Sequence, residues 1–316
     1  MQPHHRVFVA GHNGLAGSAI LRALRARGHA NLVVRSRAEL NLQEREAVFD
    51  FFRQQRPDHV FLAAARVGGI VANRDHPSEF LLQNLAIQNN VIEAAFHFRV
   101  RKLLFLGSSC IYPRDCPQPM KEEHLLSGPL ESTNEAYAVA KIAGIKLCAA
   151  YNRQFGTDFI CAMPTNLYGP GDNYDLESAH VLPALIRKFH EAVERRAPQV
   201  VVWGTGTPRR EFLYSDDLGS AAVFLMRNCR AADVGEIVNV GTGDDVSIRE
   251  LAQKIARMTG FRGELVFDAS RPDGTPRKRL DTTHMQALGW KHSVTLDEGL
   301  PRAYAAYMQT LQARAA

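Results

Sequence analysis

The stretch that decides the fold reads Arg6-Val-Phe-Val-Ala10-Gly11-His-Asn-Gly-Leu-Ala-Gly17. Its apolar residues 7–10 predict a short buried strand, and the amphipathic segment 18–27 predicts a helix. A glycine turn between a strand and a helix suits a phosphate at the helix N-terminus, although a glycine-rich turn alone is often only a turn. Here the flanking elements favour dinucleotide binding. The predicted loop consists of Gly11, which allows the tight turn, His12, Asn13, Gly14, which lets the backbone approach a pyrophosphate, Leu15, Ala16, and Gly17, which lets helix pack on strand.

The second predicted strand, residues 31–34, is followed by Arg35-Ser36-Arg37. An NAD enzyme tends to place an acidic residue at this point to bind the ribose hydroxyls. Two guanidinium groups and a hydroxyl instead suit a 2′-phosphate. The alternative is a solvated basic turn. We favour NADP over NAD.

Further apolar runs predict buried strands at residues 58–65, 102–107 and 158–164, with helical segments such as 77–98 between them. Strands that alternate with helices indicate an α/β fold with a doubly wound parallel sheet. Ligands bind at the carboxyl edge of such a sheet, where the loop 66–69 is also expected.

Loops become more frequent in the second half of the chain, which predicts a smaller lobe. One of these loops, residues 271–279, is basic and contains Pro and Gly, so it is suited to contact phosphate. We expect a cofactor-binding domain over residues 1–165, completed by roughly 212–245, and a mainly substrate-binding lobe over residues 166–316.

Tyr137 and Lys141 lie four residues apart in a run of helix formers, so both side chains share one helix face. A lysine one turn from a tyrosine favours phenolate and is expected to draw the phenol pKa down towards the range of a general acid. The alternative is a surface helix with an ordinary tyrosine and lysine. Ser108 follows the strand 102–107 and could hydrogen-bond a carbonyl that is being reduced.

The composition of the 316 residues, 46% hydrophobic and 22% charged, is typical of a soluble globular enzyme. No apolar run reaches membrane-spanning length, and the N-terminus lacks the apolar core of a signal peptide. The five cysteines show neither paired nor zinc-ligand spacing, so we expect reduced thiols, no metal and a cytoplasmic location. The net charge of +5 comes from dispersed basic residues, from which we predict no nucleic-acid partner.

The glycine loop, Ser108, Tyr137, Lys141 and the segment Pro164–Gly169 together resemble the extended short-chain dehydrogenase/reductase family, which has a Rossmann fold. Within it the chain is most similar to the bifunctional enzymes that make GDP-L-fucose. These enzymes epimerise GDP-4-keto-6-deoxy-D-mannose at C3 and C5 and reduce it at C4 with NADPH. The resemblance covers nearly the whole chain, and its sharpest matches are Gly107–Pro113, Ser132–Cys148, Pro164–Gly171 and Arg271–Lys278.

The resemblance implies a homodimer that uses NADPH and a GDP-linked ketosugar. It implies Ser108, Tyr137 and Lys141 as the reductase triad, with Cys110 and His180 as the acid/base pair of epimerisation. Beyond the glycine loop, the implied cofactor residues are Arg37, Asn41, Leu42, Leu106, Gly107, Ser108, Ser109, Lys141, Pro164, Thr165, Asn166, Leu167 and His180. The implied substrate residues are Lys188, Trp203, Arg210 and Asp273.

The chemistry of these residues can also be argued directly. A 4-keto group acidifies the C–H bonds at C3 and C5, so a base and an opposing acid can invert both centres. A thiolate at Cys110, favoured by nearby positive charge, is a competent base, although a free cysteine is often only a small buried hydrophobe. His180 can supply the opposing proton, or it can be a histidine at a helix start that the backbone satisfies.

Two of the implied substrate residues also have an interpretation that involves no ligand. Trp203 could stack on guanine, although a single Trp at a strand end more often serves packing. Arg210 could clamp the diphosphate, or it could be a solvated turn arginine.

Other functions remain open at this point. The same chemistry could act on a related GDP-ketosugar such as a GDP-heptose. An NAD-dependent nucleotide-sugar epimerase or dehydratase would hold its cofactor tightly and recycle it, and Arg35–Arg37 and Cys110 count against it. A silent NADPH-sensing module does not need the set of Ser108, Tyr137 and Lys141.

Overall fold

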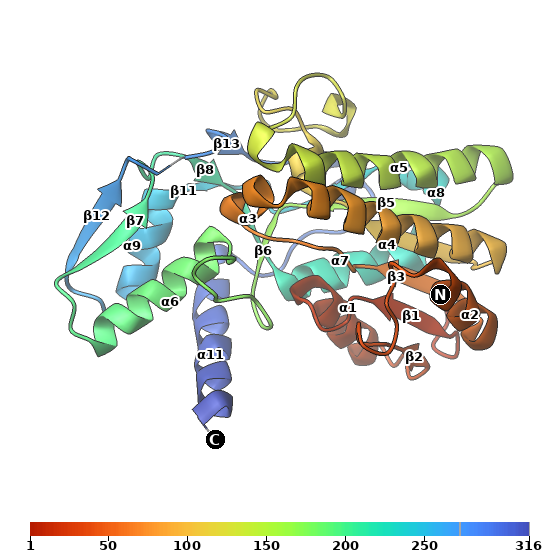
Figure 1. Ribbon diagram of the computed structural model, residues 1–316, viewed down its shortest axis with the longest axis horizontal. Coiled ribbons are helices and arrows are strands. Elements are labelled where there is room, and N and C mark those ends of the chain that lie inside the picture. Colours follow the sequence, from red (N-terminus) through yellow and green to blue (C-terminus); the bar gives the residue numbers. More distant parts are fainter. Residues whose placement is uncertain (272, 316) are drawn as a thin grey trace.

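The computed structural model describes residues 1–271 and 273–315, so Pro272 of the predicted basic loop and Ala316 lie outside the described residues. Its centre is a six-stranded sheet with the strand order β10-β5-β4-β3-β1-β2 (Figure 1). Every neighbouring pair in this sheet is parallel, which confirms the predicted doubly wound α/β fold. The strands are β1 (Val7–Ala10), β2 (Leu32–Val33), β3 (His59–Leu62), β4 (Lys102–Leu106), β5 (Phe159–Pro164) and β10 (Val238–Val240).

Helices cover both faces of this sheet. One face carries α2 (Arg45–Gln55), α4 (Pro77–His97) and α5 (Glu135–Phe155), and the other carries α1 (Leu15–Ala26) and α7 (Ser215–Asn228). Successive residues of a strand point to opposite faces, and their packing follows this rule. In β1, Val7 and Val9 pack with α1 and α7, whereas Phe8 and Ala10 pack with α2, α4 and α5.

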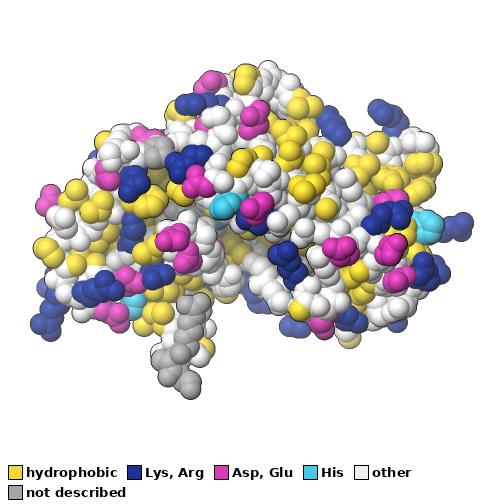
Figure 2. Space-filling view, viewed as in Figure 1, with side chains coloured by type: hydrophobic (Ala, Val, Ile, Leu, Met, Phe, Trp, Pro, Cys, Tyr) yellow, Lys and Arg dark blue, Asp and Glu magenta, His cyan; other side chains and the backbone are white. Residues whose placement is uncertain are grey.

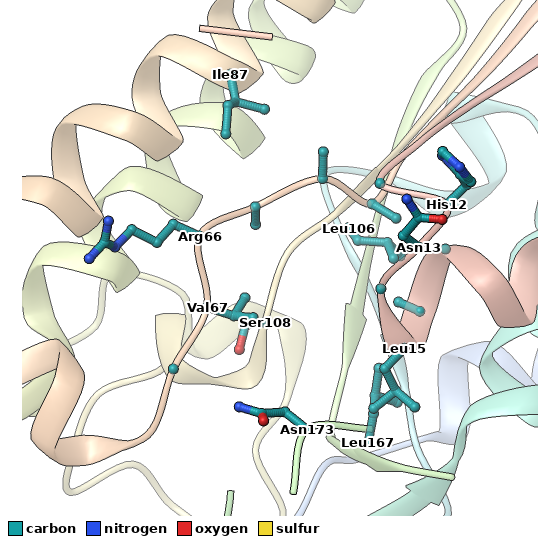
Figure 3. Close-up of a pocket in the computed structure, with 18 of the residues that line it drawn as sticks. His12, Asn13, Leu15, Arg66, Val67, Ile87, Leu106, Ser108, Leu167 and Asn173 are labelled. Carbon is teal, nitrogen blue, oxygen red and sulfur yellow. The ribbon is translucent and has the colours of Figure 1, made fainter. Parts of the chain in front are cut away.

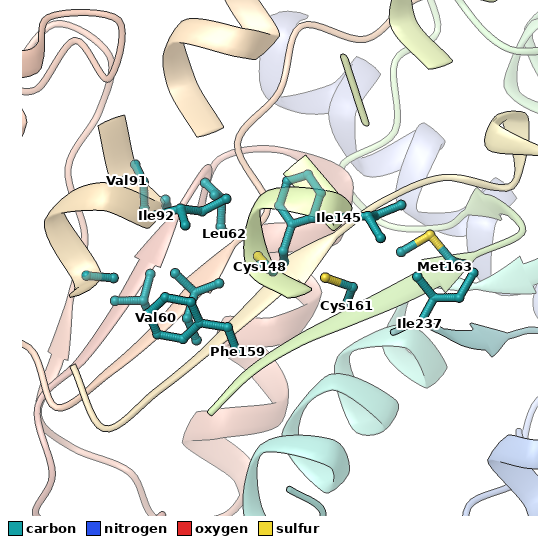
Figure 4. Packing of buried hydrophobic residues seen from close by; sticks show 14 of the residues in the cluster. Val60, Leu62, Val91, Ile92, Ile145, Cys148, Phe159, Cys161, Met163 and Ile237 are labelled. Atoms are coloured by element: carbon teal, nitrogen blue, oxygen red, sulfur yellow. The ribbon is translucent and has the colours of Figure 1, made fainter. Parts of the chain in front are cut away.

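The core beneath α4 and α5 is built from side chains of both helices and the strands (Figure 4). Val91 and Ile92 of α4 lie over Val60 and Leu62 of β3, and all four are fully buried. Burial of aliphatic and aromatic side chains of this size contributes about 2 kcal/mol each. This packing fixes the carboxyl ends of the strands, where the site residues lie.

The smaller lobe has a separate hydrophobic core. Its helices are α6 (Val181–Glu194), α9 (Ile248–Thr259) and α11 (Leu296–Ala315), which pack around the parallel pair β7 (Gln199–Trp203) and β12 (Glu264–Asp268). Ser247 caps α9 by accepting a hydrogen bond from the Glu250 backbone N–H, in a capping box. Figure 1 shows this lobe beside the carboxyl edge of the large sheet.

Short strands connect the two parts. A three-stranded sheet contains β11 (Val246–Ser247), β8 (Arg209–Arg210) and β13 (Arg277–Lys278), and β6 (Asn166–Tyr168) pairs with β9 (Phe212–Tyr214). The remaining elements are α3 (Ile70–Asp75), η1 (Ser109–Ile111), η2 (Glu122–His124), η3 (Ser132–Asn134), α8 (Ala231–Val234) and α10 (Thr283–Ala287). The segment containing α7 and β10 returns to the large sheet, while the residue bounds of the two domains stay a prediction.

Two features are absent from the described residues. No helix there combines the length and apolar character that crossing a bilayer requires. No group of three or more His, Cys, Asp or Glu side chains there is arranged to hold a metal ion.

Candidate active site

A pocket of about 630 Å³ opens at the carboxyl edge of the large sheet. Figure 3 shows His12, Asn13 and Leu15 on one side of it and Arg66 and Val67 on the other. Tyr137 lines this pocket, and so do all the predicted cofactor residues. These are Gly11, His12, Asn13, Gly14, Leu15, Ala16, Gly17, Arg37, Asn41, Leu42, Leu106, Gly107, Ser108, Ser109, Lys141, Pro164, Thr165, Asn166, Leu167 and His180.

Some lining residues were not predicted from the sequence. Gln83 and Ile87 reach the pocket from α4, and residues 171–173 reach it from the smaller lobe. No local motif marks these positions, because the packing of distant elements brings them to the pocket. The loop 63–68 also lines it, in agreement with the strand end predicted there.

Each of the three glycines of the loop has a different structural role. Gly11 has a φ of +85°, and a Cβ on Gly17 would lie 2.1 Å from the Gly11 carbonyl oxygen. A Cβ on Gly14 would meet only the same oxygen, at 3.5 Å. The fold therefore requires Gly11 and Gly17, whereas Gly14 keeps space open towards the pocket.

The N-terminus of α1 faces this space. Gly14 is its N-cap residue, and no side chain caps its first N–H groups. Uncapped N–H groups and the positive end of the helix dipole form a site for an anion. The loop and the pocket therefore fit the pyrophosphate of a dinucleotide such as NADPH.

The basic turn after β2 places its two arginines differently. The Arg35 guanidinium donates to the Val34 carbonyl at 2.7 Å and lies 5.7 Å from the centre of the Phe51 ring. Arg37 lines the pocket, and no hydrogen bond or ion pair to another described residue engages its side chain. Of the two, Arg37 is the one available to a 2′-phosphate.

The Tyr137 and Lys141 side chains leave α5 one turn apart, as predicted. Lys141 is only 3% exposed, and its ammonium donates to the Leu106 carbonyl at 2.8 Å and lies 5.8 Å from the centre of the Tyr137 ring. Burial lowers the pKa of Lys141 to about 8.

The prediction that Lys141 draws down the pKa of Tyr137 is wrong for the chain without ligands. Burial of the phenol raises its pKa above the ordinary value, and the Ser108 hydroxyl only partly opposes this. The physical reason is that a buried phenolate loses its hydration while the Lys141 ammonium is directed at a carbonyl. Tyr137 therefore stays protonated at neutral pH and can donate a proton.

Cys110 lies in η1, whose N-cap residue is Ser108. The Ser108 hydroxyl accepts the Cys110 N–H at 3.5 Å, and the Cys110 side chain is buried outside the lining of the pocket. Burial raises the pKa of the Cys110 thiol, while Lys278, Ser108 and Lys141 act to lower it. The thiol form therefore predominates in the chain without ligands, because desolvation outweighs the nearby positive charge that favours thiolate.

His180 is the N-cap residue of α6 and lines the pocket from the smaller lobe. Burial lowers its pKa below the ordinary value, so the imidazole is neutral at neutral pH. The pocket thus brings His180 together with Ser108, Tyr137 and Lys141.

The four predicted substrate residues lie in the smaller lobe and do not line this pocket. The Trp203 side chain is 46% exposed, and the Lys188 ammonium lies 4.9 Å and the Arg271 guanidinium 5.0 Å from the centre of its ring. An exposed indole flanked by cations is suited to an aromatic, anionic ligand such as a nucleotide.

Arg210 and Asp273 form the other pair. The Arg210 guanidinium donates to the Asp273 carbonyl at 3.4 Å, and burial lowers the Arg210 pKa to about 10. The Asp273 carboxylate accepts the Thr205 N–H and the Thr205 hydroxyl, both at 2.8 Å. These contacts indicate that Asp273 fixes its loop against the turn after β7.

The chain is similar to known proteins over nearly its whole length. Residues 7–241 match the NAD dependent epimerase/dehydratase family, and the chain belongs to this family. The GDP-L-fucose synthase of Escherichia coli (strain K12) is 55% identical over 310 residues, which cover 96% of this chain and 97% of that protein. The probable GDP-L-fucose synthase 1 of Oryza sativa subsp. japonica is 57% identical over 307 residues, with coverage of 97% and 93%.

A solved structure extends the similarity to the backbone. The GDP-mannoheptose C4 reductase from Campylobacter jejuni, solved with NADP bound, superposes with a TM-score of 0.90 and 40% identity. The match covers 98% of this chain and 99% of that chain.

Proposed function

We propose that this protein converts GDP-4-keto-6-deoxy-D-mannose to GDP-L-fucose by epimerisation at C3 and C5 and NADPH-dependent reduction at C4. The observation that carries this proposal is one pocket lined by the glycine loop, by Ser108, Tyr137 and Lys141, and by His180. Similarity to GDP-L-fucose synthases over 96–97% of the chain supports it.

The proposed reduction uses the groups around Tyr137. NADPH supplies the hydride when it is bound. The protonated Tyr137 phenol donates a proton to the C4 oxygen, and the Ser108 hydroxyl hydrogen-bonds the same oxygen. The buried Lys141 ammonium supplies positive charge next to the phenol and stabilises the negative charge that develops there.

The proposed epimerisation uses Cys110 and His180. Cys110 is the base that removes the protons at C3 and C5, helped by the positive charges of Lys278 and Lys141, which lower its pKa against the effect of burial. His180, on a different element, supplies the opposing proton as the imidazolium, which its lowered pKa makes a stronger acid. The proton taken by Cys110 then leaves to solvent and His180 takes one up, which restores both groups. In this proposal Lys188, Trp203, Arg210 and Asp273 form the site of the GDP moiety.

Similarity to a heptose reductase supports a second candidate substrate. The Campylobacter jejuni neighbour is named a GDP-mannoheptose C4 reductase and is 40% identical to this chain. A GDP-heptose with a keto group is therefore the second candidate substrate.

We propose further that the protein is a cytoplasmic homodimer. Leu82 on α4 is 70% exposed, and Val139 and Phe155 on α5 are 42% and 49% exposed. Figure 2 shows hydrophobic side chains gathered over α4 and α5, which supports contact with a second copy. The five free cysteines fit a reducing compartment. Light scattering on the purified protein and on Leu82→Lys tests the dimer, which the variant should weaken.

The function is tested by mixing the purified protein with NADPH and each GDP-ketosugar in turn, hexose and heptose. We expect NADPH absorbance to fall fastest with GDP-4-keto-6-deoxy-D-mannose. Unchanged absorbance with every ketosugar contradicts the proposal, and NAD bound to the purified protein would favour a recycling epimerase or dehydratase instead.

A further inference from the structure

Glu211 carries a fully buried carboxylate at the junction of the two parts of the molecule. One carboxylate oxygen accepts the N–H groups of Thr242 at 2.5 Å and Gly243 at 2.9 Å, and the Thr242 hydroxyl at 3.4 Å. The other oxygen accepts the Leu280 N–H at 2.7 Å. No Lys, Arg or His of the described residues forms an ion pair with it, so the hydrogen-bond donors alone offset the cost of burying the charge.

The main chain of Glu211 makes a second set of contacts. Its carbonyl accepts the Thr165 hydroxyl at 3.2 Å and the Asn166 side-chain amide at 2.8 Å. Its N–H donates to the Lys278 carbonyl in β13 at 3.2 Å. Since Thr165 and Asn166 line the cofactor pocket, Glu211 joins the wall of that pocket to β13 and to the turn 241–243.

Arg210 directly precedes Glu211 in the chain. Arg210 lies in β8, where it pairs with Val246 of β11 and Lys278 of β13. The carboxylate of Glu211 holds Leu280, just beyond β13, and the turn that leads into β11. Both neighbours of the Arg210 strand are therefore fixed by the same side chain.

We propose that Glu211 is a positioning residue that holds Arg210 at a set distance from the cofactor pocket, so that binding of the GDP moiety depends on it. The inference rests on the proposed function, in which Arg210 clamps the diphosphate. The contacts of Glu211 with Thr165 and Asn166 in the pocket wall are made by its main-chain carbonyl, which a change of the side chain leaves in place. NADPH binding is therefore expected to be independent of the Glu211 carboxylate.

Glu211→Gln is the informative change because it keeps the size of the side chain. A carboxylate offers only acceptors to the donors around it, whereas an amide must turn its NH2 group towards one set of N–H groups. If the NH2 group faces Leu280 or the turn 241–243, it lies against a backbone N–H that is also a donor. The hydrogen bond at that position is then lost. One neighbour of the Arg210 strand is then released.

Asp217→Asn is the matched control. The Asp217 carboxylate is also buried, at 3% exposed, and accepts the N–H and hydroxyl of Ser293 and the N–H of Val294. These contacts join α7 to the segment before α11, outside the pocket lining. Both variants replace a buried carboxylate that accepts backbone N–H groups with an amide, but at different places in the fold.

The experiment measures the Kd of GDP and of NADPH by calorimetry, and the Tm, for the full-length protein, Glu211→Gln and Asp217→Asn. We expect Glu211→Gln to weaken GDP binding at least tenfold and NADPH binding less than twofold. Asp217→Asn should lower the Tm and leave both Kd values within twofold. GDP affinity that stays within twofold in Glu211→Gln, or losses of GDP and NADPH affinity in parallel, would overturn the inference.

Two outcomes separate this inference from the proposed function. If the unmodified protein does not bind GDP, the proposed function itself fails. If it binds GDP and Glu211→Gln does not fold, Glu211→Asp is measured instead. The Asp variant keeps the charge but withdraws it by one methylene from its donors, so the same expected and contradicting results apply.

Discussion

The cofactor side and the substrate side of this molecule are built in different ways. On the cofactor side, the binding residues directly follow the strands β1, β2, β4 and β5, and they meet because the strands are parallel. On the substrate side, Lys188, Trp203, Arg210 and Asp273 come from a helix, two strand positions and a loop. A site set by strand ends is specified locally by the sequence, whereas a site assembled from distant elements depends on the residues that hold those elements together.

The largest expected effect separates the chemical step of reduction from the binding of NADPH. Tyr137→Phe removes the proton donor at C4 and should lower the turnover of reduction about 10³-fold, since the hydroxyl is needed mainly in the transition state. The Kd of NADPH should change less than the turnover, because the phenol ring and its packing against Phe80 remain. A variant that keeps most of its turnover shows that Tyr137 is only structural.

The next largest effect separates epimerisation from reduction. Cys110→Ser replaces the proposed base with a hydroxyl that stays protonated, so exchange of the C3 and C5 hydrogens with solvent should fall about 10²-fold. Reduction of the unepimerised ketosugar continues slowly, because Ser108, Tyr137 and Lys141 are retained. Equal losses of exchange and reduction would assign Cys110 a structural role.

Two glycines sharpen the comparison within the cofactor side. Gly17→Ala places a Cβ against the Gly11 carbonyl and should lower the free energy of unfolding by about 2 kcal/mol. Gly14→Ala, whose Cβ has space in the chain without ligands, should leave the Tm nearly unchanged and weaken NADPH binding. Thermal unfolding with and without NADPH distinguishes them, and equal Tm values for both variants contradict this assignment.

A smaller effect tests cofactor choice. Arg37→Glu removes the guanidinium available to the 2′-phosphate and should weaken NADPH binding about tenfold while NADH binding holds or improves. Arg210→Met is the control on the substrate side, where GDP binding falls and the preference for NADPH persists. If the unmodified protein binds NADPH and NADH equally, Arg37 does not select the cofactor.

The smallest expected effect is a dependence on pH. Lys141 is charged below its pKa of about 8 and loses its proton above it, while the raised pKa of Tyr137 keeps the phenol protonated. If the charged lysine is the active form, kcat/KM of reduction is about half its plateau value at pH 8 and falls further as the pH rises. A flat profile between pH 7 and 9 contradicts the role given to Lys141.

The sequence predicted well what the local backbone determines. The spacing of Gly11, Gly14 and Gly17 between a strand and a helix was enough to place the cofactor loop. It could not predict the direction of the pKa shifts at Tyr137 and Cys110, because those follow from burial by distant elements. A charge pattern in the sequence reports which groups are neighbours along the chain, but not how much water they keep.

The substrate side shows the same limit in another form. Asp273 was predicted from resemblance to contact substrate, and its carboxylate is engaged by Thr205. Glu211 stands beside Arg210 in the sequence without any signal of its importance. Its role becomes visible only when Thr242, Gly243 and Leu280 are seen to converge on it.

The central claim is that epimerisation by Cys110 and His180 and reduction by Ser108, Tyr137 and Lys141 act on the same GDP-ketosugar. The most direct test incubates the unmodified protein with GDP-4-keto-6-deoxy-D-mannose and NADPH in heavy water and identifies the product by NMR. The account predicts GDP-L-fucose with deuterium at C3 and C5 and one NADPH oxidised for each molecule formed. A reduced product without deuterium at these carbons, or deuterium exchange that NADPH never converts to a reduced sugar, would contradict it.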